Sequence, residues 1–447
     1  MISRSELLST FFPTWIWQGR TWLKGKVPKH DPFYWLNAHA HPVISSYYPP
    51  GIISSVLGAL LPLNAAFSVL VLSLYLHVLF AGIGWLILFK AWAATPIALF
   101  GALTMTLAGY NWKQQPCFQY TVAWFPWILY GIATNNNLIA GFSLGMTILA
   151  GYYPVGIQVA AIGFTFFFLW PGRTLPWIPI GVLIGLPQLI PFIKYLPRTI
   201  RAGGHDDIGK VPWWHPITLV VPRAFRYNIN GVGYWEMSYY VGLVPLLVIW
   251  HATSSAWAIM VIAYLLMIGV GATSLPRIPA RWSYAFQFSL GWLATSGLWN
   301  MCLPDRVVYL LCFIQAADLL LNNGGLLVTR PYSELPRRPS RAFKNRLTEY
   351  LGKPDGRVSG LPYPLFTGHI NEIKTLGYSG GMQLKLMAKW RNDGNSNGSG
   401  EHDFFKRNKD GEPLDIARVQ FAYTRTRPDW ASTPIRNLYK NRRFSDR

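Results

Sequence analysis

Long runs of apolar residues, separated by polar turns, fill the chain from about residue 51 to residue 328. The hydrocarbon core of a bilayer is about 30 Å thick, and one helix needs about 20 mostly apolar residues to cross it. Shorter runs also suffice where aromatic or basic residues flank them. The pattern therefore predicts an all-α polytopic membrane domain with about ten transmembrane helices. The predicted spans are 65–89, 94–110, 119–133, 138–152, 158–171, 176–196, 238–252, 256–273, 284–300 and 307–323.

The lengths of the connections between these runs predict an orientation in the membrane. Tight turns carry Lys90, Arg173 and the pair Asp305–Arg306, and alternation of the spans puts them all on one side. Short loops with Lys and Arg stay in the cytoplasm, so this side is predicted to be cytoplasmic. The N-terminal stretch, the long Trp-rich loop 197–237 and the C-terminal tail are then extracytoplasmic, which is allowed because long segments translocate largely regardless of charge.

The chain divides into three regions. Residues 1–50 are aromatic and interrupted by prolines, so they cannot cross a bilayer as one helix and are interpreted as the first extracytoplasmic loop. Residues 51–328 are the membrane domain, and residues 329–447 are a basic, water-soluble C-terminal domain. Within the tail, two blocks of alternating apolar character, 356–390 and 414–426, predict strands of a small α+β unit.

The composition is typical of a membrane protein and limits the classes of molecule that the protein is expected to bind. The chain is 51% hydrophobic and 13% charged, whereas soluble domains carry about 25% charged residues. Its formal net charge of +21 suits a nucleic acid, an anionic lipid or an anionic substrate. No zinc-finger, RNA-recognition or helix-turn-helix pattern accompanies the scattered basic residues, so no nucleic-acid partner is predicted. Anionic head groups or lipid phosphates fit better, and a solvated basic tail is the alternative.

The cysteines and histidines predict no metal site. Cys117, Cys302 and Cys312 lie in or beside apolar runs without paired spacing, so neither a disulfide framework nor a zinc site follows. His39 and His41 are separated by one residue, a spacing that can ligate a metal on a strand, but no carboxylates cluster beside them. An ordinary loop is the simpler interpretation, and the sequence identifies no cofactor.

Several loose motifs follow one another in one order along nearly the whole chain. Glu6 is followed seven positions later by Pro13, in Glu-Leu-Leu-Ser-Thr-Phe-Phe-Pro. The longest motif runs from Tyr234 to Leu243 as Tyr-Trp-Glu-Met-Ser-Tyr-Tyr-Val-Gly-Leu. The others are Gly25-Lys26-Val27-Pro28, Asp31-Pro32-Phe33, Tyr47-Tyr48-Pro49-Pro50, His77 with Ala81-Gly82 and Gly84, Gly109-Tyr110, Ala123-Trp124-Phe125-Pro126, Pro187-Gln188 with Pro191, Arg198 and Arg201, Pro276-Arg277 with Pro279 and Arg281-Trp282, and Arg357-Val358, Asn371 and Gly377-Tyr378 in the tail. In this order the motifs resemble the YfhO family of bacterial membrane proteins, which belongs to the GT-C glycosyltransferases.

The resemblance implies a GT-C-like fold and transfer of a sugar from a polyprenyl-phosphate carrier to an extracytoplasmic acceptor. Membrane lipid and a lipid-linked sugar phosphate are then the expected partners. The implied location is the bacterial cytoplasmic (inner) membrane. The chain departs from the family pattern at both ends, because the usual first spanning helix is missing and the tail lacks the further domain of longer members. The acidic residue of the first loop is Glu6, where the family has Asp.

Sugar transfer from a lipid phosphate requires a general base for the acceptor hydroxyl and cations for the departing phosphate. Glu6 and Asp31 are the candidate bases, although Glu6 also suits the first turn of a helix and Asp31 precedes a proline, as in ordinary turns. Glu236 lies beside a predicted span, where a carboxylate needs a partner, so it either binds substrate or pairs with an arginine. Arginines at helix ends also meet lipid head groups. The other candidate substrate-binding residues are His39, His41, Arg198, Arg201, Arg277 and Arg281.

Two further functions stay open. The first is a catalytically inactive relative that serves as a scaffold subunit of a larger membrane complex. The missing first helix, the Glu6 substitution and the basic tail motivate it. The second is a transporter, which is weaker because no pair of ionisable residues lies in the middle of the predicted spans.

Overall fold

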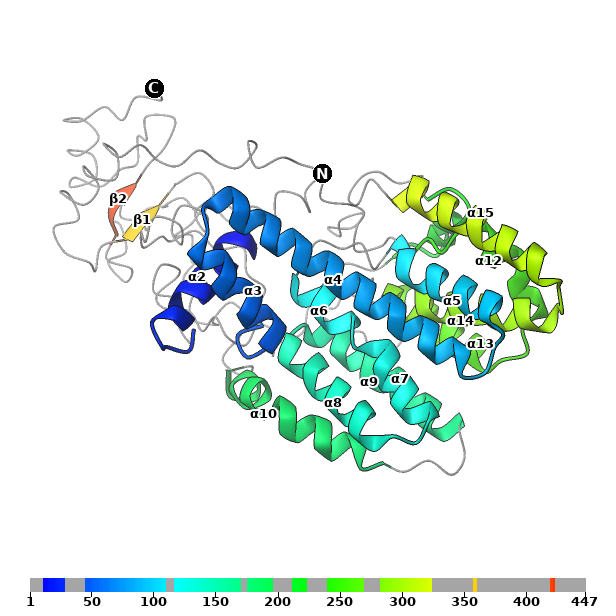
Figure 1. The fold of residues 1–447 in the computed structure, drawn as a ribbon, viewed down its shortest axis with the longest axis horizontal. Helices are drawn as coiled ribbons and strands as arrows, with labels where there is room; N and C mark the ends of the chain where they lie inside the picture. The colour runs from blue at the N-terminus through cyan, green and yellow to red at the C-terminus, as the bar shows by residue number, and fades with distance from the viewer. Residues whose placement is uncertain are drawn as a thin grey trace, which may run out of the picture.

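The computed structural model describes residues 11–28, 45–109, 116–169, 175–195, 211–222, 239–268, 282–323, 357–359 and 419–422. These residues are helical almost throughout (Figure 1). In chain order the helices are α2 (Phe12–Leu23), α3 (Pro49–Leu60), α4 (Leu63–Lys90), α5 (Thr95–Leu107), α6 (Pro116–Val122), α7 (Phe125–Ala133), α8 (Asn137–Ala150), α9 (Tyr153–Leu169), α10 (Trp177–Tyr195), η6 (His215–Leu219), α12 (Leu243–Val248), η7 (Ile249–His251), α13 (Ala256–Ile268), α14 (Ser283–Asn300) and α15 (Asp305–Asn323). The strands are β1 (Arg357–Ser359) and β2 (Val419–Ala422).

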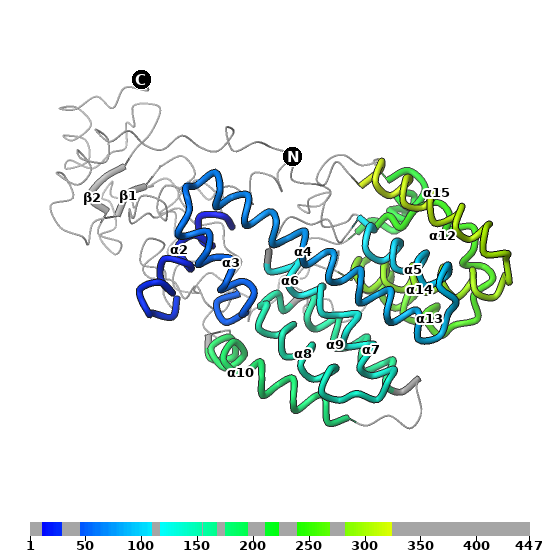
Figure 2. Tube along the Cα trace, viewed as in Figure 1, coloured from blue at the N-terminus to red at the C-terminus, as the bar shows by residue number. Residues whose placement is uncertain are grey.

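The longest described helix, α4, connects the N-terminal helices to the rest of the fold. Figure 2 shows α3 beside its N-terminal part and α5 and α7 beside its C-terminal part. α4 has 28 residues, which corresponds to about 42 Å of helix. Among the described residues, α4 and Trp177–Lys194 of α10 are long and apolar enough to cross a bilayer. The fold is therefore mostly helical with two helices that can span a membrane, and the larger number of spans stays a prediction.

The turn after α4 and the turn after α14 lie at the same end of the helices, which we call the turn end. The ring of Trp92, after α4, lies 6.2 Å from that of Trp299, near the end of α14. The Asn300 side-chain amide donates a 2.8 Å hydrogen bond to the carbonyl of His251, the last residue of η7. The turns that carry Lys90 and Asp305 therefore share one end, whereas the turn with Arg173 lies outside the described residues and the membrane side stays a prediction.

Other helix ends meet at the opposite end, which we call the loop end. The Asn323 side chain, at the end of α15, donates a 2.9 Å hydrogen bond to the carbonyl of Leu107, the last residue of α5. Just beyond α5, the Gly109 amide donates a 3.0 Å hydrogen bond to the carbonyl of Tyr240. The segment that leads into α12 is therefore fixed at the loop end.

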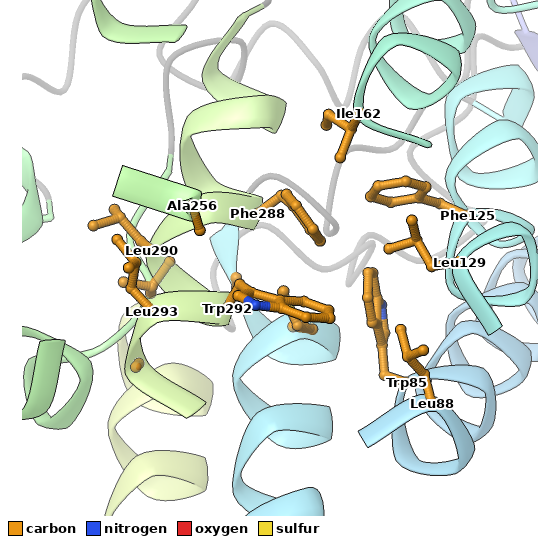
Figure 3. Packing of buried hydrophobic residues seen from close by; sticks show 14 of the residues in the cluster. Trp85, Leu88, Phe125, Leu129, Ile162, Ala256, Phe288, Leu290, Trp292 and Leu293 are labelled. Carbon is orange, nitrogen blue, oxygen red and sulfur yellow. The ribbon is translucent and has the colours of Figure 1, made fainter. Parts of the chain in front are cut away.

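Aromatic side chains around α14 form the centre of the fold. All residues of α14 from Ser283 to Thr295 are buried. Figure 3 shows Phe288 and Trp292 of this helix facing Phe125 and Trp85. The ring of Phe125 lies 5.0 Å from Phe288 and 5.5 Å from Trp85. These spacings are typical of favourable aromatic pairs, so α14 is packed on several sides by large rings.

Helices α8 and α10 run parallel and pack through glycines on both helices. A Cβ atom built on Gly145 of α8 lies 2.5 Å from Ile184, and one built on Gly181 of α10 lies 2.7 Å from Leu144. Each helix has a second glycine four positions away, at Gly141 and Gly185, with similarly short distances. This arrangement of small residues allows close backbone approach and is common between helices in membranes.

Two predicted spans differ from the observed helices. The run 119–133 forms two helices, α6 and α7, because Pro126 in the first turn of α7 has no N–H and begins a new helix. The run 238–252 forms only α12 and η7. Gly242 precedes α12 with a φ of 97°, which glycine adopts readily, and it orients the chain into that helix.

Two helices were not expected from the sequence. α2 and α3 lie in and next to the region interpreted as the first loop, where prolines suggested irregular chain. Pro13 and Pro49 instead stand in the first turns of these helices, as the second residue of α2 and the first residue of α3. Proline is well tolerated there because the first N–H groups of a helix have no partner within the helix.

The two strands pair in parallel, Arg357–Ser359 with Val419–Ala422. One strand comes from each of the two blocks of the tail predicted to form strands. The rest of residues 329–447 lies outside the described residues, so the α+β domain itself stays a prediction.

Candidate functional site

Every residue assigned to the site from the sequence lies outside the described residues. These are Glu6, Asp31, His39, His41, Arg198, Arg201, Glu236, Arg277 and Arg281. The structure does describe the residues that flank the candidate residues in the sequence. Their positions show where each segment with a candidate residue joins the fold.

The segment 29–44, which includes the first-loop candidates after Glu6, has both ends fixed near each other. The hydroxyl of Ser46 donates a 3.5 Å hydrogen bond to the carbonyl of Pro28. The neighbouring Ser45 hydroxyl donates a 2.6 Å hydrogen bond to the carbonyl of Ala150, the last residue of α8. The segment therefore leaves and rejoins the described chain beside the C-terminal end of α8.

The described residues after Glu236 and after Arg281 also lie near each other. Glu236 comes three positions before Tyr239, and Arg281 comes two positions before the start of α14. The Tyr239 ring lies 5.0 Å from that of Phe286, in the first turn of α14. Because the adjacent Tyr240 is hydrogen-bonded at the loop end, both segments connect to the fold there.

The C-terminal part of α10, after which Arg198 and Arg201 follow, packs against the chain just beyond α8. The Tyr153 hydroxyl donates a 3.1 Å hydrogen bond to the carbonyl of Gln188. The Tyr153 ring also stacks on Phe192 of α10, with 3.8 Å between centroids. The C-terminal ends of α8 and α10 therefore lie together, and the two arginines follow from there in the sequence.

A buried polar cluster lies where residues 45–48 meet α4. His77 Nδ1 lies 2.6 Å from the Ser73 carbonyl, which only accepts hydrogen bonds, so Nδ1 carries the proton. Nε2 then accepts a 2.8 Å hydrogen bond from the Tyr48 hydroxyl. The Tyr48 oxygen accepts in turn from Trp124 Nε1 at 2.8 Å. We call these four residues the His77 cluster.

Further polar contacts surround the His77 cluster. The Tyr120 hydroxyl lies 3.1 Å from the Ser73 hydroxyl, and the Tyr120 ring lies 4.4 Å from the ring of His77. Trp15 of α2 donates a 3.4 Å hydrogen bond from Nε1 to Ser54 of α3. Polar contacts therefore join α2 to α3 and α4 to α6, next to the fixed ends of the first-loop segment.

The His77 cluster is built to position the chain rather than to react. Among the described residues, the hydrogen bonds given above use each polar side-chain group of His77, Tyr48 and Trp124, and none of these bonds involves a carboxyl group. Burial raises the pKa of the Tyr48 hydroxyl, which keeps it a neutral donor. Because the His77 imidazole and the Tyr48 hydroxyl are both neutral, this network supplies no positive charge for a phosphate. It fixes the connection between the first-loop segment and α4.

Asp318 of α15 forms a second polar cluster at the loop end. The Tyr240 hydroxyl lies 2.8 Å from each of its carboxyl oxygens. Oδ2 accepts a 2.8 Å hydrogen bond from the Leu243 amide at the start of α12, and Oδ1 accepts at 2.6 Å from the Asn322 side chain. Asp318 therefore holds the chain that follows Glu236 against α15.

His215 of η6 is buried against Tyr239 of the same loop-end region. Its Nδ1 lies 2.6 Å from the Tyr239 hydroxyl. Burial lowers the pKa of His215 from 6.5 to about 4, because the charged imidazolium loses its hydration. The side chain is therefore neutral at neutral pH and serves as a hydrogen-bonding core residue.

In the part of the chain that the structure describes, no group of three or more His, Cys, Asp or Glu side chains comes together as a metal site. No protein-family model matches the chain, and no curated protein matches it. The resemblance inferred from the motifs therefore stays a prediction.

Sequence reasoning missed two of the positioning residues. Asp318 carries a detectable signal, since a lone carboxyl group in an apolar helix needs a partner. Among the described residues, its side-chain partners are the neutral Tyr240 and Asn322. His77 entered the sequence argument only as part of a motif, and its partner Tyr48 lies in a different motif.

Proposed function

We propose that the chain is a multi-pass membrane glycosyltransferase of GT-C type, which transfers a sugar from a polyprenyl-phosphate donor to an extracytoplasmic acceptor. Glu6 or Asp31 acts as the general base for the acceptor hydroxyl. Glu236, His39 and His41 contribute to substrate binding. Arg198, Arg201, Arg277 and Arg281 bind the donor phosphate and stabilise its charge as it departs.

The observation that carries this proposal is the connection of the candidate-bearing segments to one end of the fold. The Phe118 ring joins the two places, since it lies 5.6 Å from Tyr152, just beyond α8, and 6.3 Å from Tyr284, in the first turn of α14. The ends of segment 29–44 are fixed beside the end of α8, next to the part of α10 that precedes Arg198. Tyr239 and the start of α14, which adjoin Glu236 and Arg281, are held together at the loop end. A base, a carboxylate and several cations on neighbouring segments suit a phosphate-linked donor.

Exposed apolar side chains support placement in a membrane. On α4, Leu72, Leu76, Leu79 and Ile83 follow one another at helical spacing, and each is 46–59% exposed. On α15, Phe313 is 73% exposed. A continuous exposed apolar helix face is unfavourable in water and suits contact with lipid chains. Together with the close glycine packing of α8 and α10, it supports more spans than length alone identifies.

The bacterial cytoplasmic membrane is the location that follows from this proposal, with the loop end and the C-terminal domain outside the cytoplasm. The positive-inside rule supports the orientation, because Lys90 and Arg306 lie in or next to turns at the turn end. Membrane lipid and the lipid-linked sugar phosphate are the partners.

The purified full chain, reconstituted in lipid, tests the proposal when it is incubated with radiolabelled polyprenyl-phosphate sugars. Release of the sugar from the carrier, or its appearance on an acceptor, is the expected result. Combined Arg198→Gln and Arg201→Gln substitutions should raise the donor KM, whereas Arg306→Gln at the turn end is the matched control and should not.

A scaffold subunit in a membrane complex is the second candidate. The His77 cluster and the Asp318 cluster favour this alternative, because their polar groups form hydrogen bonds that hold chain segments in place, as a structural subunit requires. Co-purification with other membrane subunits at fixed stoichiometry, together with no turnover of any lipid-linked sugar, is the result that this alternative predicts.

A further inference from the structure

Residues 211–222, which we call the tryptophan segment, have two contrasting faces. Val211, His215 and Thr218 are buried. The large apolar side chains of the other face are exposed, with Trp213 at 74%. The other exposed members, at 41–59%, are Trp214, Ile217, Val220 and Val221. An apolar face exposed to this extent needs a covering partner.

The buried face holds the tryptophan segment firmly against the fold. The Val211 amide donates a 3.0 Å hydrogen bond to the carbonyl of Met267, near the end of α13. The Tyr264 hydroxyl of α13 donates a hydrogen bond to the Trp213 carbonyl. His215 contacts Tyr239, as described above. The exposed face is therefore held outward by a fixed backbone.

The segment lies at the loop end, beside the exposed apolar surface of α13. Tyr239 links it to Tyr240, whose carbonyl is hydrogen-bonded to Gly109 just beyond α5. On α13, Val261 and Ile262 are 50% and 56% exposed, and the same helix supplies Tyr264 to the segment. The exposed face of the segment therefore adjoins a helix face suited to lipid chains.

The chemistry of this face identifies its partner. η6 has five residues, far fewer than the about 20 needed to cross a bilayer. Tryptophan side chains prefer the boundary between head groups and acyl chains. The sequence places Lys210 directly before the segment and Arg223 directly after it, which suits anionic head groups. We propose that Trp213, Trp214, Ile217, Val220 and Val221 insert into the head-group boundary of the bilayer at the loop end, so that residues 211–222 are an interfacial anchor.

This inference rests on the membrane placement in the proposed function and not on sugar transfer. An anchored tryptophan segment lies at the membrane surface, where a lipid-linked ligand presents its head group. An inactive scaffold embedded in the same membrane would have the same anchor. Failure of the anchor and failure of the transfer assay are therefore separate results.

Spin labels on single cysteines test the anchor in the full chain. The background variant is Cys302→Ser, because Cys302 is exposed while Cys117 and Cys312 are buried. Ile217→Cys and Val220→Cys are labelled in bilayers of phosphatidylethanolamine and phosphatidylglycerol. Collision with oxygen, which enters lipid, is compared with collision with a water-soluble nickel chelate.

Leu79→Cys on the exposed face of α4 is the control for the lipid core, and Ala91→Cys in the turn after α4 is the control for water. The expected oxygen-to-nickel ratio at positions 217 and 220 is severalfold above the Ala91 control and below the Leu79 control. A ratio equal to the water control overturns the proposal. Low collision with both reagents also overturns it, because protein rather than lipid then covers the face.

Discussion

The hydroxyl of Tyr48 donates a 2.8 Å hydrogen bond to Nε2 of His77, across 29 positions of sequence. Nε2 of His77 can only accept in this contact, because the ring proton is on Nδ1 and is donated to the Ser73 carbonyl. Trp124 completes the arrangement by donating to the Tyr48 oxygen. The place where the first-loop segment joins the helices is therefore set by a few neutral hydrogen bonds.

Substitution Tyr48→Phe should destabilise the fold. It removes one hydroxyl, so that the acceptor nitrogen Nε2 of His77 loses its donor and the Trp124 N–H loses its acceptor, at a cost of about 1–3 kcal/mol. The unfolding midpoint in detergent should fall accordingly. Tyr309→Phe is the matched control, because Tyr309 is 49% exposed, and its midpoint should stay at the wild-type value. Equal midpoints for the two variants would contradict the role given to Tyr48.

Asp318→Asn should also lower stability. The substitution replaces one acceptor oxygen by an NH₂ group, which then faces a donor from Tyr240, Leu243 or Asn322. We expect a loss of about 1.5–3 kcal/mol in the free energy of unfolding. Asp305→Asn, an exposed position in the first turn of the same helix, should cost less than about 1 kcal/mol. A double-mutant cycle with Tyr240→Phe should give a coupling energy above zero, and additive effects would contradict the contact.

Gly181→Leu should disrupt the packing of α8 on α10. Even a Cβ atom at this position lies 2.7 Å from Leu144, so the helices must separate. Overpacking of this kind typically costs about 1–3 kcal/mol, and the upper end is expected because the close atoms include the Cβ of Leu144, which moves only with its helix. Gly156→Ala is the control, since its nearest neighbour would be 3.9 Å away. The unfolding midpoint in detergent measures both, and an unchanged midpoint for Gly181→Leu would show that the two helices do not pack this way.

Stability should depend on pH through His215. Its pKa is lowered from 6.5 to about 4 in the folded protein, so the unfolded chain binds a proton more readily. The contribution of neutral His215 to the free energy of unfolding is fully present above pH 6.5 and is lost as the pH falls towards about 4. This pKa difference corresponds to on the order of 3 kcal/mol at most.

His215→Gln removes the titrating group and should flatten that part of the stability profile. The comparison is the difference between the unfolding midpoints at pH 7.5 and at pH 5, two values chosen on either side of the ordinary histidine pKa of about 6.5. The difference should be smaller in the variant than in the wild-type protein. An identical pH dependence would assign the effect to other groups.

Much of the helical arrangement could be predicted from the sequence. The apolar runs that form α4, α5 and α8 match their helices to within a few residues. The prolines near α2 and α3 predict irregular chain, whereas Pro13 and Pro49 stand in the first turns of these helices and start them. Likewise, hydropathy shows no break at Pro126, where the missing N–H divides one predicted span into α6 and α7.

The polar clusters were harder to predict than the helices. Nothing in the local sequence pairs Tyr48 with His77, since the contact depends on where α3, α4 and α6 pack. Asp318 could have been selected as a lone acidic residue in a predicted span, but its neutral partner Tyr240 could not. The assigned site residues, from Glu6 to Arg281, lie outside the described residues, so their roles rest on motif order and on the positions of their neighbours.

The most direct test of the proposed activity is the initial rate of sugar transfer from a labelled polyprenyl-phosphate donor by the reconstituted chain, measured for Glu6→Gln, Asp31→Asn and the acidic control Asp305→Asn. Loss of the general base should lower the rate by about 100-fold or more in Glu6→Gln or in Asp31→Asn. Asp305→Asn, at the turn end, should keep the wild-type rate. Transfer that is undiminished in both first-loop variants, or absent from the wild-type chain with every donor, would contradict the proposal.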